Sequence, residues 1–245
     1  MRREMFAPKN RTKLSFVLRL VLAAFFAIAF VQPMFAQRGS FAESIAAGVI
    51  TAPASTTVGK FMRKAISVTI QGVGGSVTVT SSDASKVTVA STPTGVGGSS
   101  ASFLESGTFA VYVDGLDSTG SATLTVSASG FSNATTTVNL GLSGFTGNIA
   151  PNLILGTSDA PVVICPSLLT NVGAFIEDET LSPGVSTASV IVTSSDTSKG
   201  TITTSPVVFN AGDTCKSPAT ALHAVAAGTA TVTLGTPVGY STPNP

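Results

Sequence analysis

One stretch of sequence occurs twice in the chain. Residues 76–89 are SVTVTSSDASKVTV, and residues 189–202 are SVIVTSSDTSKGTI. Ten of the fourteen aligned positions are identical, and the two stretches start 113 residues apart (189 minus 76). A chain rich in Ser, Thr and Val produces short matches by chance, but few of them would keep the aspartate, the lysine and their spacing together. The repetition therefore predicts two copies of one domain.

Each stretch has the pattern of a strand followed by a turn. Val77 and Val79 alternate with Ser and Thr, and this period of two with β-branched residues is typical of a half-buried strand. The SSDxSK segment that follows carries short polar side chains that bond their own backbone, which favours a turn. We therefore interpret Asp83 and Asp196 as turn-formers. A ligand-binding role for either would need more carboxylates nearby, and the sequence has few.

Further period-two segments surround the stretch in the first copy. Short strands with a turn every 8–12 residues are typical of a Greek-key sandwich. An expected turn, GVGG, occupies residues 72–75. The expected strands are residues 48–52, 64–71, 76–80, 86–89, 101–104, 108–114, 121–127 and 135–140.

The beginning of the chain has the pattern of a secretory signal peptide. Six basic residues precede an apolar run, LVLAAFFAIAFV at residues 20–31, which is too short to span a bilayer comfortably. Small residues around Ala36 offer a cleavage site, so we expect residues 1–36 to be removed. An uncleaved membrane anchor is the alternative. After cleavage we expect no transmembrane segment and a secreted or cell-surface location.

Composition excludes some functions for the exported chain. The chain has 13 basic and 12 acidic residues, and the expected signal peptide contains six of the basic residues and one of the acidic ones. The remaining 7 basic and 11 acidic residues give a net charge of −4. This balance lacks the basic footprint of a nucleic-acid-binding protein. The chain has no Trp and two Tyr, which argues against a strong sugar-stacking platform. We expect no cofactor and an unidentified surface or extracellular partner.

The second copy repeats more than the opening stretch. GTATVTL at residues 228–234 resembles GSATLTV at residues 120–126, and a Gly-aromatic-Ser triplet follows in both copies. GLSGFTGNIAP, at residues 141–151, has the composition of a linker. The expected organisation is a signal peptide at 1–36, a lead-in at 37–57, domain 1 at 58–141, a linker at 142–151 and domain 2 at 152–245.

These motifs resemble the bacterial immunoglobulin-like domains that recur in tandem in exported surface proteins. The resemblance rests on V-x-V-T-S-S-D-x-S-K, on Gly-[Ser/Thr]-Ala-Thr-[Leu/Val]-Thr and on the Gly-[Phe/Tyr]-Ser that follows. It covers most of residues 58–245 and implies an all-β fold of two tandem Greek-key sandwiches. It also implies a non-catalytic spacer or adhesion module at the cell surface. Accessory domains of a larger extracellular hydrolase, or a glycan- or calcium-binding module, are the alternatives.

Two cysteines lie in the second copy, Cys165 and Cys215. An exported chain meets an oxidising compartment, and an even count leaves no thiol over. We therefore predict one disulfide between them, with two separate thiols as the alternative.

The other candidate site residues have simpler interpretations. His223 is the single histidine and makes neither a triad nor a metal site alone. The run Glu177-Asp178-Glu179 is either a solvated turn or a weak calcium site, since calcium needs several oxygen ligands on one loop. Asp114 and Asp117 carry the same ambiguity. We predict no catalytic, cofactor-binding or metal-binding residue.

The second copy is shorter than the first at its end. In the first copy a full strand, TTTVNL, follows the Gly-aromatic-Ser triplet, whereas the second copy continues only with TPNP. Two prolines in four residues cannot donate to a ladder. We therefore expect the second sandwich to lack its last strand and to expose an unpaired edge at residues 229–234. Either the chain continues in a longer protein, or a strand from elsewhere fills the gap. A neighbouring copy of the chain could donate that strand by self-association.

Overall fold

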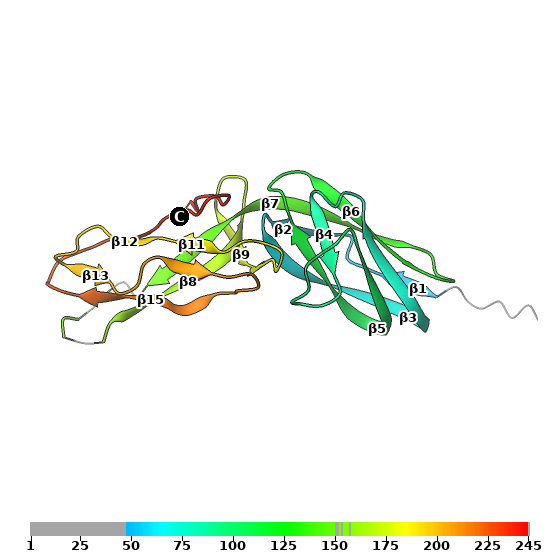
Figure 1. Cartoon of the computed structure of the whole chain (residues 1–245), viewed down its shortest axis with the longest axis horizontal. Coiled ribbons are helices and arrows are strands. Elements are labelled where there is room, and N and C mark those ends of the chain that lie inside the picture. Colours follow the sequence, from blue (N-terminus) through cyan, green and yellow to red (C-terminus); the bar gives the residue numbers. More distant parts are fainter. Residues whose placement is uncertain (1–47, 150–151, 153, 157, 245) are drawn as a thin grey trace, which may run out of the picture. The chain divides into compact units, whose positions relative to one another are not determined.

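The structure is a computed structural model that describes residues 48–149, 152, 154–156 and 158–244. Every regular element in these ranges is a β-strand, which confirms the expected all-β fold (Figure 1). In the same ranges, no helix is long and apolar enough to cross a membrane. The expected signal peptide, and the lead-in up to residue 47, lie outside the described residues.

Seven strands build the first half of the molecule. We call the part up to Gly141 the first repeat and the part from Leu142 to Asn244 the second repeat. The strands are β1 (Val49–Thr51), β2 (Ser55–Gly59), β3 (Met62–Ser81), β4 (Val87–Ala90), β5 (Ser100–Gly115), β6 (Ser121–Ala128) and β7 (Ala134–Ile149).

The first repeat has two layers, and the long strands β3 and β5 each contribute to both of them. Their halves at residues 63–70 and 107–114 pair with each other, with β1 and β4 at the flanks. The later half of β3 pairs with β6, which pairs with β7, and β7 pairs in parallel with β2. Inward side chains meet between the layers with no solvent exposure, and they include Val68, Val79, Val111, Leu124 and Val138.

Two sequence expectations for the first repeat are wrong in detail. The expected turn at residues 72–75 lies inside β3, where the pairing with β5 shifts register between Ile70 and Gly75. The two strands expected at 101–104 and 108–114 are one strand, β5. In both cases a bulge in a continuous ladder replaces the turn, because glycine tolerates an irregular backbone without ending the strand. Gly72 has φ 141° and Gly107 has φ 82°.

The second repeat consists of shorter strands. β8 pairs on its two sides with β7 and β15, and β9 and β13 extend this layer. β11 pairs with β14, and β12 pairs with β16. The strands are β8 (Ala160–Leu169), β9 (Phe175–Asp178), β10 (Thr180–Leu181), β11 (Ala188–Val190), β12 (Val192–Ser194), β13 (Gly200–Ile202), β14 (Val207–Phe209), β15 (Lys216–Ala224) and β16 (Val232–Leu234).

The repeated sequence makes the same turn twice. Asp83 Oδ1 accepts hydrogen bonds from the amide and hydroxyl of Ser85, and Asp196 Oδ1 accepts the same two from Ser198. These hydroxyl bonds are the main reason why the pKa of each aspartate lies below its usual value. Both aspartates are therefore turn-formers, as the sequence predicts.

The expected linker at 142–151 is wrong for Leu142–Ile149, which form the second half of β7. All eight of these residues pair with β8, between Leu169 and Val162. Figure 1 shows β7 as one continuous arrow from the strands of the first repeat to those of the second. The last strand of one repeat is therefore also the first strand of the next.

Candidate functional site

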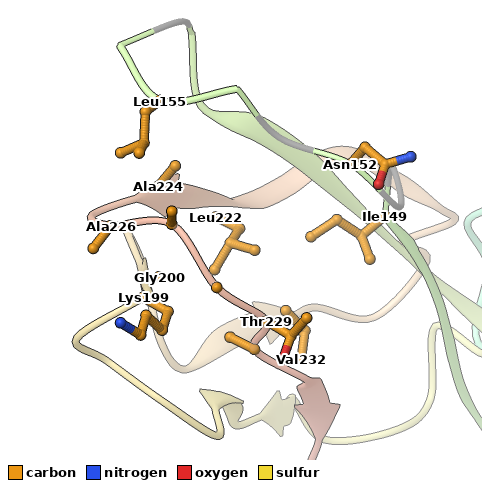
Figure 2. A pocket seen from close by; sticks show the side chains of 13 residues that line it. Ile149, Asn152, Leu155, Lys199, Gly200, Leu222, Ala224, Ala226, Thr229 and Val232 are labelled. Atoms are coloured by element: carbon orange, nitrogen blue, oxygen red, sulfur yellow. The ribbon is translucent and has the colours of Figure 1, made fainter.

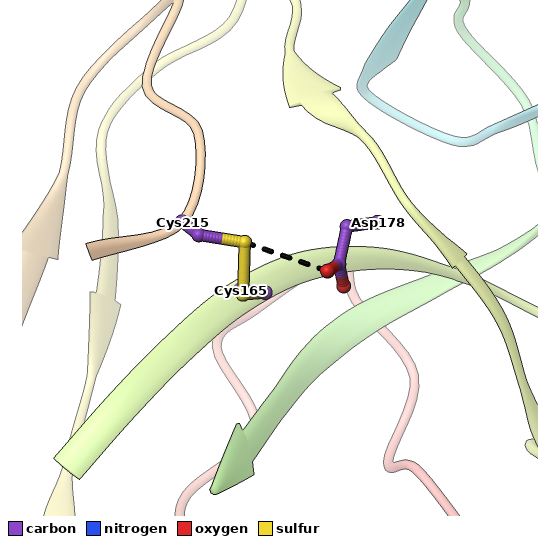
Figure 3. A group of neighbouring side chains, drawn as sticks. All are labelled: Cys165, Asp178 and Cys215. Carbon is purple, nitrogen blue, oxygen red and sulfur yellow. Dashed lines mark hydrogen bonds between the residues drawn. A yellow bond between two sulfur atoms is a disulfide. The ribbon is translucent and has the colours of Figure 1, made fainter. Parts of the chain in front are cut away.

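The two cysteines form the predicted disulfide. Cys165 lies in β8 and Cys215 immediately precedes β15, with sulfurs 2.07 Å apart and Cα atoms 4.1 Å apart. Figure 3 shows the carboxylate of Asp178 facing the bridge, with Oδ2 3.5 Å from Cys215 Sγ. Among the described residues these three form the only cluster of metal-ligand type. Oxidised sulfurs have no thiolate to offer, so the cluster is a structural bridge rather than a metal centre.

The carboxylates of the acidic run point to three different partners. Glu177 pairs with Lys64 of the first repeat, and Asp178 Oδ1 accepts a hydrogen bond from Ser167. Glu179 is 7% exposed, and its Oε2 accepts a hydrogen bond of 2.9 Å from the amide of Gly59. The run is therefore not a ligand loop of the kind that calcium requires. The expected solvated turn is also wrong, because Glu177 and Asp178 end β9 and Glu179 is buried.

Glu179 is a buried carboxyl at the contact between the repeats. Burial is the main reason why its pKa is raised to about 7, while the Gly59 amide and Lys64 oppose the shift and Glu177 adds to it. Its second oxygen, Oε1, has no hydrogen-bond partner among the described residues. The site thus favours the protonated form at mildly acidic pH.

The other candidate residues are structural. Asp114 is 1% exposed and makes a two-point salt bridge with Arg63, at 2.7 and 2.6 Å. Asp117 accepts a hydrogen bond from the amide of Ser118. His223 Nδ1 lies 2.6 Å from Asp159 Oδ1 in an exposed pair. The structure brings none of these residues together with another of the candidates.

Further contacts join the repeats around the middle of β7. β10 adds to β3 through Thr180 and Leu181, and the Ser143 hydroxyl donates to the Lys60 carbonyl at 2.6 Å. The ring of Tyr240 packs on Phe61 and Phe145, at centroid distances of 5.6 and 5.0 Å. We call this set of contacts, together with the Glu177–Lys64 and Glu179–Gly59 pairs, the joint.

The edge of β16 that faces away from β12 has no strand beside it among the described residues. Val192 pairs with Leu234 across the ladder, Gly235 donates its amide to Ile191, and Ser195 donates its amide to Thr231. In an antiparallel ladder bonded pairs alternate with non-bonded pairs, so Thr233 also bonds to β12. The amides and carbonyls of Val232 and Leu234 therefore point to the opposite side.

An apolar groove runs along this open edge. Its volume is about 380 Å³, and strand β7 from Phe145 to Ile149 forms one wall while β16 forms the other. Residues 242–244 line one end, where the Ser241 amide donates to the Ser143 carbonyl at 2.7 Å. Among the described residues, those that line the groove carry no charged side chain.

A second hollow continues from the groove toward the far end of the repeat. Its volume is about 460 Å³, and it shares Ile149 and Val232 with the groove. Figure 2 shows Ile149, Leu222 and Val232 around it, contributed by β7, β15 and β16. The core of the second repeat is thus partly open to solvent along the groove and the second hollow.

The open edge that the sequence predicts at residues 229–234 is therefore present, but the strand itself, β16, covers only Val232–Leu234 of that range. Sequence reasoning missed the groove, because the glycines at its wall had indicated a linker. No protein-family model matches the chain, and no curated protein matches it either.

Proposed function

We propose that the chain is a non-catalytic, exported protein whose immunoglobulin-like repeats act as a stiff spacer at the cell surface. The observation that carries this proposal is the shared strand β7, which belongs to both repeats without an intervening loop. A strand with ladders on both halves resists bending at the point where tandem domains usually hinge.

The joint adds to this stiffness. The buried Glu179 carboxyl and the Ser143 hydroxyl each cross from the second repeat to backbone groups of the first. Such contacts to backbone hold the two repeats in one arrangement without relying on long, mobile side chains.

Export is supported by the N-terminal sequence and by the disulfide. The basic start and the apolar run have the pattern of a signal peptide, and disulfides persist in oxidising compartments. The low content of charged residues, 10%, agrees with strand faces that carry hydroxyl groups.

The test is a distance measurement across the joint. Asn133→Cys and Ala227→Cys place spin labels at exposed sites in the first and the second repeat. Double electron–electron resonance on the purified exported chain should give one narrow distance distribution. A matched pair within the first repeat, Asn133→Cys with Ser118→Cys, sets the width expected for a rigid unit. A distribution across the joint several times broader than this reference would contradict the spacer.

A further inference from the structure

We propose that the groove beside β16 is a strand-acceptor site, which binds an extended, uncharged strand of another polypeptide antiparallel to β16. The proposal goes beyond the spacer function. The occupant is a peptide with alternating inward aliphatic or hydroxyl side chains, of the kind that the first repeat itself places at the equivalent position.

β16 is the equivalent of β6 in the second repeat. Thr123 donates its amide to the Ser82 hydroxyl and accepts the Ser82 amide at its carbonyl. Thr231 forms the same two bonds with Ser195. The two strands therefore occupy the same place in the two repeats, with Val232 equivalent to Leu124 and Leu234 equivalent to Val126.

In the first repeat, β7 lies beside β6. Leu140 donates its amide to the Gly120 carbonyl, so the alternation places Leu124 and Val126 in bonded pairs with β7, opposite Thr136 and Ala134. These are the positions whose equivalents in β16 point to the open side. The second repeat thus presents the backbone donors and acceptors that the first repeat uses to hold its last strand.

The inward side chains of β6 and β16 differ in burial. Leu124 and Val126 have no solvent exposure, whereas Val232 and Leu234 are only partly buried. The inward residues Thr136, Val138 and Leu140 of β7 cover the first core. A strand of the same pattern in the groove would cover the second core and satisfy an edge that otherwise invites pairing.

The chemistry of the groove selects the occupant. Its described lining residues are uncharged and include the apolar side chains of Phe145, Ile149 and Val162. A charged inward side chain would lose its hydration there without gaining a partner. The outward face of the incoming strand is unrestricted, because that face meets solvent.

The direct test uses a fluorescent peptide with the sequence of residues 133–141, NATTTVNLG. Fluorescence anisotropy with the purified exported chain should show saturable binding. A control peptide with Val138→Asp places a charge inward and should bind at least about tenfold more weakly, which corresponds to roughly 1.4 kcal/mol. Absence of saturable binding by the parent peptide, or equal binding by the control, would overturn the proposal.

Two variants of the protein locate the binding. Val232→Pro removes an amide that faces the groove and leaves the bonds between Thr233 and β12 in place, so peptide binding should fall while the thermal transition is kept. If that variant does not fold, the second variant still decides the question. It carries a flexible linker and NATTTVNLG after Pro245, and it should no longer bind the peptide and should unfold at higher temperature. A linker followed by the Val138→Asp sequence is its control.

Self-association is also informative. If the parent protein forms dimers that the free peptide dissociates, the natural occupant is a strand from a second copy. If dimers form and the peptide has no effect on them, the groove is not the acceptor.

Discussion

The two repeats share a turn and a strand ladder, but they are closed by different means. The first repeat is sealed on both sides by its own strands, and its inward aliphatic side chains have almost no exposure. In the second repeat, no described strand lies beside β16 on the side away from β12, and this repeat carries the disulfide instead. The difference shows that one hydrogen-bonded frame can be stabilised either by a complete core or by a covalent link across a less complete one.

The largest expected effect is at the buried ion pair of the first repeat. Arg63 and Asp114 have side-chain exposures of 3% and 1%, and Arg63 also donates to the carbonyls of Pro93 and Gly95. Arg63→Met leaves the Asp114 carboxylate buried without a partner and should cost about 3–5 kcal/mol. Chemical denaturation measures this cost.

The matched control for this prediction is the exposed pair of the second repeat. Lys216→Met breaks the bond to Asp213, at 2.9 Å, where both side chains are about a third exposed. This change should cost less than about 1 kcal/mol, because water screens the pair. If the two variants lose the same free energy of unfolding, the buried ion pair does not stabilise the first repeat more than the exposed pair stabilises the second.

The disulfide should matter only to the second repeat. It closes a loop with a sequence separation of 50, for which the chain-entropy model gives roughly 4 kcal/mol as an upper value. The Cys165→Ala, Cys215→Ala double variant should therefore lose amide hydrogen-exchange protection in β8 and β15 while β3 and β6 are unaffected. Equal loss in both repeats would mean that they unfold as one cooperative unit.

Removing the same side chain from equivalent strands should sharpen the comparison of the cores. Leu124→Ala, in β6, should cost about 2–5 kcal/mol, because it opens a cavity in a fully buried site. Leu234→Ala, in β16, should cost less, because Leu234 is already partly in contact with water. Thermal unfolding of the two variants gives the difference, and an equal or larger cost for Leu234→Ala would contradict the open edge.

The last expected effect is a pH dependence at the joint. The pKa of Glu179 is raised from 4.5 to about 7 in the folded chain, so between these values the folded chain keeps a proton that the unfolded chain releases. The free energy of unfolding should therefore fall as pH rises through this window, by on the order of 1–3 kcal/mol. Glu179→Gln has no proton to lose and should flatten this part of the profile. If the pH profile of stability is the same in Glu179→Gln as in the parent protein, other titratable groups cause the pH dependence.

The strands with clear alternation could be predicted from the sequence. Segments such as the one around Val77 and Val79 lie where the period of two places them, and the disulfide followed from an even number of cysteines in a chain that was expected to be exported. These predictions succeeded because they depend on local side-chain pattern or on residue count.

The shared strand could not be predicted, because its glycines serve packing rather than turning. A Cβ at Gly147 would lie 2.8 Å from Leu234 Cδ1, and one at Gly144 would lie 2.5 Å from the Ser241 carbonyl oxygen. Neither glycine has a positive φ. Composition alone does not distinguish a glycine that permits close approach from one that permits a turn. The burial of Glu179 was equally invisible, because its partner Gly59 lies 120 residues away.

The shared strand also sets a rule for insertions and deletions. Inward positions of β7 are even-numbered in the first repeat, as in Val138 and Leu140, and odd-numbered in the second, as in Ser143 and Phe145. One residue added after Leu142 would turn Phe145 from the second core toward solvent, because strand side chains alternate. Two added residues would keep Phe145 inward and lengthen the strand by roughly 7 Å. Length variation at this junction should therefore be tolerated in steps of two residues.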